Sequence, residues 1–397
     1  MLPSRAVPLP IAKLENPIQP YAWGSREAIA RLQGRPCPSP TPEAEIWIGD
    51  HPVAPSRVVG DGEKLPLSDW IARDRASALG PDHRDLPFLT KVLAAGRSLS
   101  VQVHPDAARA CQGFARENAA GVPDDRRSYR DSNAKHEVLV ALSPFEALCG
   151  FREDASVAGA IAAVPSLAQA SLPPGPGPLA LRLLHGLQRL DTAARARLLA
   201  ELAVFAEGDS RDAKICRQLL DEHPGDPLAC APMLLNAVHL APGEALIVRP
   251  GTVHAYLQGS GVEVMTRSDN VVRAGLTPKH VDADELLAVT AARTGDDEIQ
   301  RPPADPSRPG ESSYETGTDV FSLCALDLAA SPLRRPGGHV TVVLCVEGGV
   351  RLDELPASGR ATVELGAGEA ALVPARVEAF QLTRTARTSR VFEVSAR

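Results

Sequence analysis

Alternating polar and apolar side chains predict a short β-strand at residues 98–104, which Pro105 ends. Side chains two residues apart share one face of a strand, so Ser100, Gln102 and His104 project together while the intervening apolar residues face the opposite way. A row of three polar groups opposite an apolar face is unusual for a strand. The polar face is therefore a candidate functional surface.

The wider hydrophobic pattern separates β-rich regions from a helical region. Residues 1–151 contain mostly short apolar runs bounded by turn signals, with one helical spacing after Asp106. Residues 152–236 are rich in Ala and Leu at helical spacing and predict an inserted helical domain. Strand patterns return in residues 237–295, and a Pro-rich, charged linker then leads into short strands from Tyr314 onward.

Two of the β-rich stretches resemble each other, namely APGEALIVRPGTVHAY at residues 241–256 and LGAGEAALVPARVEAF at residues 365–380. Counted from Gly243, Gly251 stands at +8 and His254 at +11, which is similar to the second metal motif of cupin barrels. In the later stretch, Arg376 and Ala379 hold the equivalent positions. We therefore predict a mainly β fold with an inserted α domain, in which two cupin-type (jelly-roll) β-barrels accompany the helical domain and only the first barrel binds metal.

The predicted boundaries follow from these changes of pattern. A catalytic metal-binding cupin domain comprises residues 1–151 and 237–295, and the inserted helical domain comprises residues 152–236. A C-terminal degenerate cupin domain comprises residues 296–397. A chain of 397 residues is long enough for two or three such domains.

The polar strand face supplies part of a predicted metal site. A cupin usually takes its ligands from a His-x-His strand, a later Glu and the histidine of the second motif. Here Gln102 and His104 replace the His-x-His pair, Glu137 supplies the carboxylate, and His254 completes the set. These donors suit Zn²⁺, with Mn²⁺, Co²⁺ and Fe²⁺ as alternatives. One carboxylate leaves the site with a net charge of about one positive, which favours Lewis-acid chemistry.

Six motifs in the order and spacing of one family identify a broader resemblance. They are PYAWGS, AEIWIGDHP, LPFLTKVLAAGRSLSVQVHPD, FEALCGFR, PGTVHAYLQG and SDNVVRAGLTPKHVD. The chain resembles type I mannose-6-phosphate isomerase, also called phosphomannose isomerase. This resemblance implies a zinc enzyme that interconverts mannose 6-phosphate and fructose 6-phosphate, with the four residues above as zinc ligands and Arg273 as an active-site arginine.

The implied reaction defines two further sets of candidate residues. Moving a proton between C2 and C1 through a cis-enediol needs a base and a group that stabilises the oxyanion. Arg273 and the metal fit the second role, and Glu263 and Lys135 are the candidates for the base. The substrate phosphate needs cationic or hydroxyl partners. Besides Arg273, the matched candidates are Lys91, Ser100 and Lys279.

One segment departs from the family pattern. The family usually reads Asn-His-Lys-Pro-Glu where this chain reads Asn-Ala-Lys-His-Glu at residues 133–137. A mechanism that uses the missing histidine as an obligatory base does not fit this chain. His136 faces the opposite side of a strand from its neighbours, so it is no simple replacement. Glu263 is therefore the first candidate for the base, with Lys135 and metal-bound hydroxide as alternatives.

Composition narrows the remaining function classes. A net charge of −7 and an aromatic content of 4% argue against nucleic-acid binding. No apolar run reaches the roughly 18 residues of a membrane helix, and prolines interrupt the N-terminus where a signal peptide needs an apolar run. The seven cysteines form no Cys-x-x-Cys pair, which argues against disulfides and thiolate zinc sites. We expect a cytoplasmic monomer that binds a small sugar phosphate.

Two other functions compete with isomerisation. A bicupin that binds sugar without catalysis would need no Lewis acid, and a cupin iron oxygenase favours two histidines and one carboxylate with open positions. The intact ligand set and the amide ligand favour the isomerase over both. We assign no function to the other histidines outside residues 133–137, which are His51, His83, His185, His223, His239, His280 and His339.

Overall fold

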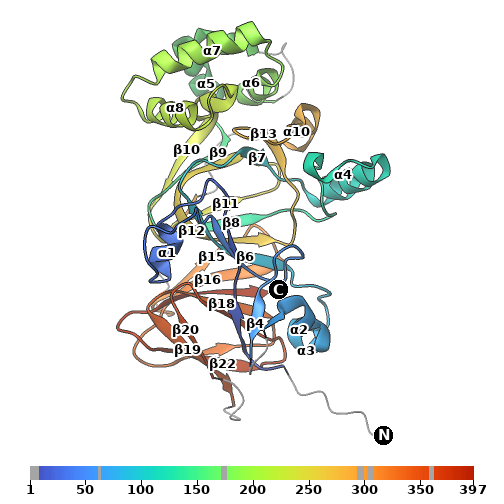
Figure 1. Ribbon diagram of the computed structural model, residues 1–397, viewed down its shortest axis with the longest axis vertical. Coiled ribbons are helices and arrows are strands. Elements are labelled where there is room, and N and C mark those ends of the chain that lie inside the picture. The colour runs from blue at the N-terminus through green and yellow to red at the C-terminus, as the bar shows by residue number, and fades with distance from the viewer. Residues whose placement is uncertain (1–8, 61–63, 171–176, 293–298, 303–306, 357–361) are drawn as a thin grey trace.

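The computed structural model describes residues 9–60, 64–170, 177–292, 299–302, 307–356 and 362–397, and strands dominate it (Figure 1). The chain is mostly sheet with several helices, as the hydrophobic pattern predicts. In Figure 1 helices α5 to α8 lie at one end, a large sheet lies in the middle, and the strands of the C-terminal region lie at the other end. Among the described residues, no helix is long and apolar enough to cross a membrane.

The middle of the molecule is an antiparallel sheet whose hub is the long strand β12. This strand pairs with β6 and β8 along one part of its length and with β7 and β9 near its start. The sheet comprises β2 (Ile18–Gln19), β3 (Glu45–Ile48), β6 (Phe88–Ala95), β7 (Val101–Val103), β8 (Glu137–Ala141), β9 (Phe145–Phe151), β10 (Leu235–Leu240), β11 (Ala245–Val248), β12 (His254–Thr266), β13 (Val272–Gly275) and β14 (Ile299–Gln300). Because β12 touches four strands, it gathers side chains from distant parts of the sequence.

Two further sheets contain the strands from Glu311 onward. The larger has the order β15 (Glu311–Tyr314), β16 (Phe321–Asp327), β23 (Arg390–Ala396), β18 (Thr341–Glu347), β21 (Ala370–Val373), β1 (Ala12–Glu15), β4 (Arg57–Val59) and β5 (Lys64–Pro66). The smaller has the order β17 (Leu333–Pro336), β22 (Ala379–Arg384), β19 (Gly349–Leu355) and β20 (Thr362–Gly366). Three strands from the first 66 residues therefore complete a sheet that otherwise comes from the C-terminal region.

The longest run of helices lies between β9 and β10, where the Ala- and Leu-rich pattern predicts it. It contains α5 (Asp154–Ala163), α6 (Leu179–Leu187), α7 (Thr192–Phe205), α8 (Arg211–Glu222) and α9 (Ala231–Leu234), with 3₁₀ turns at Pro165–Ala170 and Pro227–Cys230. Asp191 and Ser210 cap α7 and α8 by accepting hydrogen bonds from backbone N–H groups, which explains where these helices begin. Their apolar faces share one buried cluster with side chains of β7 and β13. The helices therefore pack directly on strands that carry candidate site residues.

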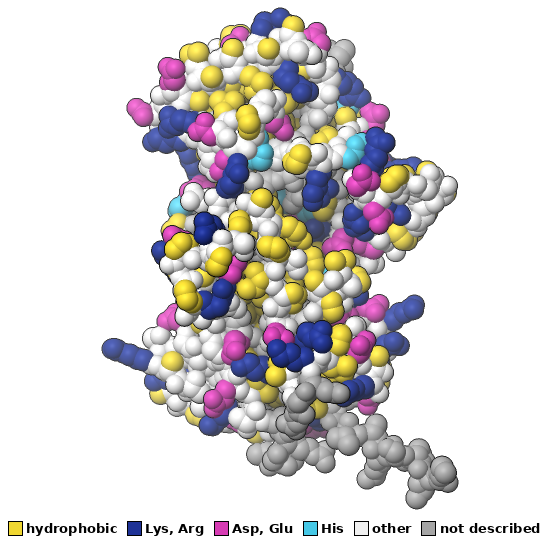
Figure 2. Space-filling model, in the orientation of Figure 1, with side chains coloured by type: hydrophobic (Ala, Val, Ile, Leu, Met, Phe, Trp, Pro, Cys, Tyr) yellow, Lys and Arg dark blue, Asp and Glu magenta, His cyan; other side chains and the backbone are white. Residues whose placement is uncertain are grey.

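The remaining helices border the sheets. They are α1 (Ala28–Leu32), α2 (Leu67–Arg73), α3 (Arg75–Leu79), α4 (Ala107–Ala120), α10 (Ala283–Val289) and a 3₁₀ turn at Asp124–Arg126. Asp106 caps the start of α4, and Gly121 ends it in the left-handed conformation that favours glycine. Helix α4 projects from the side of the molecule (Figure 1). On the face of the molecule that Figure 2 shows, acidic and basic side chains are interspersed.

Candidate metal centre and active site

Three buried side chains from separate strands meet at one point. His104 follows β7, Glu137 begins β8 and His254 begins β12, and each is at most 2% exposed. The Nε2 atoms of His104 and His254 lie 3.3 and 3.5 Å from Oε2 of Glu137. One ligand atom from each residue lies within 4.8 Å of the other two, and this is the only such group in the described part of the chain. The prediction of a metal centre here is confirmed.

Hydrogen bonds orient both imidazoles for metal binding. Nδ1 of His104 lies 2.9 Å from the backbone oxygen of Asn270, and Nδ1 of His254 lies 3.1 Å from that of Thr252. A carbonyl oxygen can only accept, so each Nδ1 donates and each Nε2 presents its lone pair to the centre. His104 Nε2 and Glu137 Oε2 are buried without a hydrogen-bond partner, as expected for atoms that bind an ion.

The charge states of these ligands also fit a cation. Burial lowers the pKa of His104 to about 4, so this ligand is neutral at pH 7. Burial alone would raise the pKa of Glu137, but a protonated His104 and Lys135 hold that pKa well below its usual range; at pH 7, where His104 is neutral, Lys135 is the cation that keeps the carboxylate ionised. The Nζ atom of Lys135 lies 3.1 Å from Oε1 of Glu137. Neutral imidazoles and an ionised carboxylate are the forms in which these side chains bind metal.

Gln102 and Ser100 lie at the edge of this group. The side-chain nitrogen of Gln102 lies 3.3 Å from Nε2 of His254, and exchanging the oxygen and nitrogen of the amide brings its oxygen to the same side. Ser100 Oγ lies 3.4 Å from the amide oxygen of Gln102. The amide is thus beside the three ligands, where the sequence placed a fourth.

The C-terminal repeat carries an ion pair where the first repeat has its metal motif. Arg376 makes two contacts of 2.8 Å with the carboxylate of Glu354. Ala379, in place of a histidine, begins β22. Gly243 and Gly368 begin the two repeats with the same left-handed conformation, with φ of 90° and 81°. The repeats thus share their turn but differ in their chemistry.

A buried ion cluster lies next to the metal ligands. Lys91 on β6 faces Glu263 on β12 in the strand register, with Nζ 3.0 Å from Oε2 of Glu263 and 3.4 Å from Oε1 of Glu45. The other oxygen of Glu45 accepts a hydrogen bond of 2.8 Å from the Trp47 indole. Burial raises the pKa of Glu263 and outweighs the opposing charge of Lys91. Sequence patterns placed Glu263 inward but did not reveal its pairing with Lys91.

Three cations form a second group beside the ligands. Arg273 on β13 lies opposite Gln102 in the strand register, and Lys279 follows it in the next turn. Burial lowers the pKa of Arg273, and the charge of Arg130 lowers it further. Burial also lowers the pKa of Lys279, and Arg273 and Arg130 add to the effect. Within the described residues, no ion pair joins these three side chains to a carboxylate, so they offer unneutralised positive charge to an anion.

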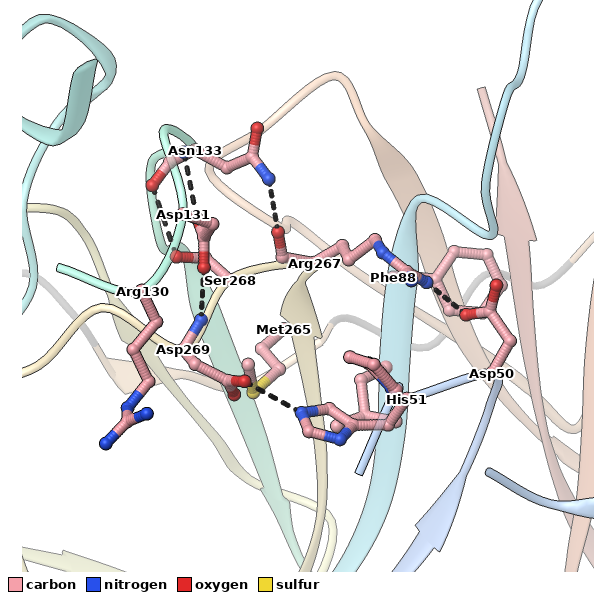
Figure 3. Close-up of a pocket in the computed structure, with 12 residues that line it drawn as sticks. Asp50, His51, Phe88, Arg130, Asp131, Asn133, Met265, Arg267, Ser268 and Asp269 are labelled. Carbon is pink, nitrogen blue, oxygen red and sulfur yellow. Dashed lines mark hydrogen bonds and ion pairs between the residues drawn. The ribbon is translucent and has the colours of Figure 1, made fainter. Parts of the chain in front are cut away.

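A cavity of about 140 Å³ contains two further polar residues that sequence reasoning missed (Figure 3). Nε2 of His51 lies 2.8 Å from Oδ2 of Asp269, and Arg130 lines the same cavity. Burial would raise the pKa of Asp269, but its hydrogen bond and charge interaction with His51 and the charges of Lys135 and Lys91 lower it. His51 and Asp269 stand in two motifs that carry the family resemblance, GDHP and SDN. Their place in these motifs was the sequence signal that could have identified them as candidate site residues.

Two buried residues hold the loop that carries Arg130. The Asn270 side chain accepts a hydrogen bond of 2.7 Å from the Arg130 N–H and donates to the backbone oxygens of Asp131 and Asn133. Glu285 on α10 accepts from Arg109 and Arg116 of α4 at 2.7 and 2.6 Å and from the Tyr129 hydroxyl at 2.5 Å. These contacts connect α4, α10 and the loop at residues 129–133 into one unit beside the cavity.

Comparisons with known proteins show the family of the chain. The model of the type I phosphomannose isomerase catalytic domain matches residues 11–154. The mannose-6-phosphate isomerase of Escherichia coli K12 is 35% identical over 405 residues, which cover 96% of this chain and 99% of the relative. The chain belongs to the type I phosphomannose isomerase family.

Solved phosphomannose isomerase structures share the fold over nearly the whole chain. A zinc-bound mannose 6-phosphate isomerase has a TM-score of 0.88 at 34% identity and covers 98% of this chain and 100% of its own. A mutant of the Salmonella typhimurium phosphomannose isomerase has a TM-score of 0.87 at 34% identity, with the same coverage. The resemblance to this family is therefore confirmed.

The segment that departs from the phosphomannose isomerase pattern has two faces. Glu137 belongs to the metal group and Lys135 contacts it, whereas His136 lines a separate cleft of about 510 Å³ together with Thr318 and Asp319. Nδ1 of His136 is buried without a hydrogen-bond partner. The His136 ring therefore points away from the centre and does not replace the histidine that Ala134 lacks.

Proposed function

We propose that this chain interconverts mannose 6-phosphate and fructose 6-phosphate with one Zn²⁺ per chain. The observation that carries the proposal is the buried group of His104, Glu137 and His254, with the unneutralised cations Arg273 and Lys279 on the neighbouring strand and turn. A sugar phosphate needs both features, because its phosphate is anionic and its reacting carbonyl needs polarisation. Membership of the phosphomannose isomerase family supports this assignment.

The donor set suits Zn²⁺ through His104, Glu137, His254 and the amide oxygen of Gln102. A bound Zn²⁺ supplies a Lewis acid that polarises an oxygen of the substrate. Lys135 keeps Glu137 ionised, and the carbonyl of Asn270 keeps His104 in the tautomer that presents Nε2. These contacts prepare the ligands without any rearrangement of the strands.

The phosphate end of the substrate would contact the cationic group. Arg273 and Lys279 provide positive charge without a competing carboxylate, and the Ser100 hydroxyl lies beside Gln102 on the same polar strand face. Lys91 is already paired with Glu45 and Glu263, so we propose that it acts on the substrate through Glu263 rather than by binding phosphate.

Proton transfer requires one base that serves both carbons. The base takes the proton from C2 to give the cis-enediol and returns a proton to C1, while the hydroxyl proton on O2 is lost and O1 gains one. We propose Glu263 for this role because burial raises its pKa toward the working range of a general base. Lys135, 3.1 Å from Glu137, remains the alternative. Arg273 would stabilise the negative charge that develops on the enediolate oxygens.

The finer architecture is also a proposal. We propose two cupin-type barrels, the first from residues 1–151 and 237–295 and the second from residues 296–397, with residues 152–236 as an inserted helical domain. In this assignment β1, β4 and β5 are exceptions because they pair into the C-terminal sheet, and β14 is another because it pairs with β11 in the middle sheet. We further propose that the chain acts as a monomer.

A coupled assay tests the function. Fructose 6-phosphate formed from mannose 6-phosphate would be measured for the purified chain before and after chelation, and after Zn²⁺ is added back. We expect activity that chelation removes and Zn²⁺ restores. Binding of mannose 6-phosphate without turnover in the zinc-loaded protein would instead identify a sugar-binding protein.

A further inference from the structure

One residue beside the cationic group has an unusual backbone. Leu276 has φ of 54°, and it is the only non-glycine residue with positive φ in the ranges that the structure describes. Left-handed backbone is unfavourable for a side chain with a Cβ atom, so the surroundings must hold it. Leu276 is also only 2% exposed. It lies between Arg273 and Lys279, so its conformation sets the direction in which the chain carries these two cations.

The helical insert supplies the contact that holds this conformation. Oδ2 of Asp226 accepts a hydrogen bond of 2.6 Å from the Leu276 N–H, and Oδ1 accepts one of 2.9 Å from the Leu228 N–H. Asp226 therefore joins the start of the 3₁₀ turn at Pro227–Cys230 to the end of β13. Hydrogen bonds to an ionised carboxylate are shorter and stronger than those between neutral groups.

Two neighbouring contacts make this attachment rigid. The side chain of Gln188, which follows the last residue of α6, donates a hydrogen bond of 2.5 Å to the backbone oxygen of Ala274. At Gly275 an added Cβ would lie 2.9 Å from a methyl carbon of Leu228, so the backbone of β13 packs closely on the insert. The insert thus contacts the three consecutive residues that follow Arg273. Residues held in sparsely populated backbone conformations cluster at functional sites, where the surroundings fix them.

We propose that Asp226 is a positioning residue for the phosphate end of the substrate. Its carboxylate holds Leu276 in the left-handed conformation, and this directs Arg273 and Lys279 toward one anion. The helical insert, which contributes no metal ligand, thereby takes part in substrate binding. This inference rests on the proposed function, because it concerns the site at which the sugar phosphate would bind.

The experiment compares Asp226→Ala and Asp226→Asn with wild type in the full-length, zinc-loaded protein. We expect Asp226→Ala to raise KM for mannose 6-phosphate about tenfold or more and to raise the inhibition constant of inorganic phosphate by a similar factor, while zinc content stays unchanged. Asparagine keeps one acceptor oxygen for two N–H groups, so Asp226→Asn should give an intermediate KM. Should the alanine variant not fold, the asparagine variant alone decides.

Asp191→Ala is the matched control. Asp191 also lies in the insert and accepts a hydrogen bond from a backbone N–H, that of Ala194 at 2.7 Å, but this contact caps α7, and among the described residues no hydrogen bond joins Asp191 to β13. We expect its KM and phosphate inhibition to match wild type. If Asp226→Ala and Asp226→Asn both fold and retain wild-type KM and phosphate inhibition, or if Asp191→Ala shifts them equally, the positioning role is wrong.

A double-mutant cycle tests whether Asp226 acts through the cations. If it does, Asp226→Ala should raise KM less in a Lys279→Ala background than in wild type, because the contact it positions is already lost. Full additivity of the two effects on KM would overturn the inference. A wild-type protein without isomerase activity would instead refute the proposed function itself, before any variant is compared.

Discussion

Replacing Glu263 by Gln should lower kcat strongly while lowering the free energy of unfolding only moderately. Gln keeps the size of the side chain but removes its charge and basicity. A general base typically contributes about 10²- to 10⁴-fold in rate, so we expect kcat to fall by that order if Glu263 is the base. Zinc content should not change, because the metal group is built from other residues.

The distances indicate how much stability this change removes. At an effective dielectric constant of about 20, Lys91 gains about 5.5 kcal/mol from Glu263 at 3.0 Å and about 5 kcal/mol from Glu45 at 3.4 Å. After Glu263→Gln, Lys91 therefore still has a carboxylate partner. We expect a loss of about 1.5–3 kcal/mol, the value of one hydrogen bond to a charged group. Lys91→Met leaves two buried carboxylates without a cation and should cost more, about 3–5 kcal/mol.

Three measurements check this prediction. Urea unfolding of the zinc-loaded proteins gives the free energies of unfolding, the coupled assay gives kcat, and exchange of the C2 proton of the substrate with deuterated solvent reports the base directly. We expect exchange to slow in step with kcat in Glu263→Gln. Near-normal exchange in this variant would remove Glu263 as the base and transfer the role to Lys135. A smaller stability loss in Lys91→Met than in Glu263→Gln would contradict the charge argument.

Further predictions follow from the other groups. His104→Ala should remove most bound zinc and nearly all activity, which metal analysis and the coupled assay check; retained zinc would make the role of His104 catalytic instead. Metal analysis of the wild type should find one equivalent of zinc per chain. Two equivalents would contradict the prediction that the C-terminal repeat, with Arg376 and Ala379 at the motif positions, binds no metal. Arg273→Ala should lower kcat and raise KM, whereas Lys279→Ala should mainly raise KM, and equal KM-only effects would restrict Arg273 to binding. Burial would raise the pKa of Glu285, but hydrogen bonds from Arg109 and Tyr129 and the charges of Arg109 and Arg116 lower it. The stability that Glu285 contributes is therefore present above its unfolded pKa of about 4.3 and is lost as the pH falls through its folded pKa. The unfolding free energy of Glu285→Gln should therefore lie below that of wild type at pH 7 and approach it as the pH falls toward 3; a gap that does not change with pH would refute this.

The sequence predicted most of the metal site because its ligands follow local rules. Alternation placed Gln102 and His104 on one strand face, and the turn spacing from Gly243 located His254. The strand itself is shorter than the alternation suggested and covers Val101–Val103. Before it, the carboxylate of Glu222 on α8 accepts hydrogen bonds from the Ser98 N–H and hydroxyl at 2.7 and 2.5 Å, so a contact from a helix replaces strand pairing.

Contacts between distant residues explain what the sequence did not reveal. His51 looked like a histidine without a function because its partner Asp269 lies 218 positions away. The pairing of Lys91 with Glu263 spans 172 positions, and that of Asp226 with Leu276 spans 50. Local periodicity reports which side of a strand a residue occupies, but it contains no information about which strand lies alongside.

The position of β1 also sets the order in which the protein can be completed during translation. Ala12 pairs with Leu372, 360 residues later, and Lys13 forms an ion pair of 2.7 Å with Glu369. At about 5–20 residues per second, β21 leaves the ribosome roughly 20–70 s after β1. During that interval one edge of β1 has no native partner, and an unpaired edge invites incorrect pairing. The strand β21 is therefore required to complete the pairing of β1, and a chain whose synthesis stops before residue 370 would keep the β4 partner of β1 but leave its other edge unpaired.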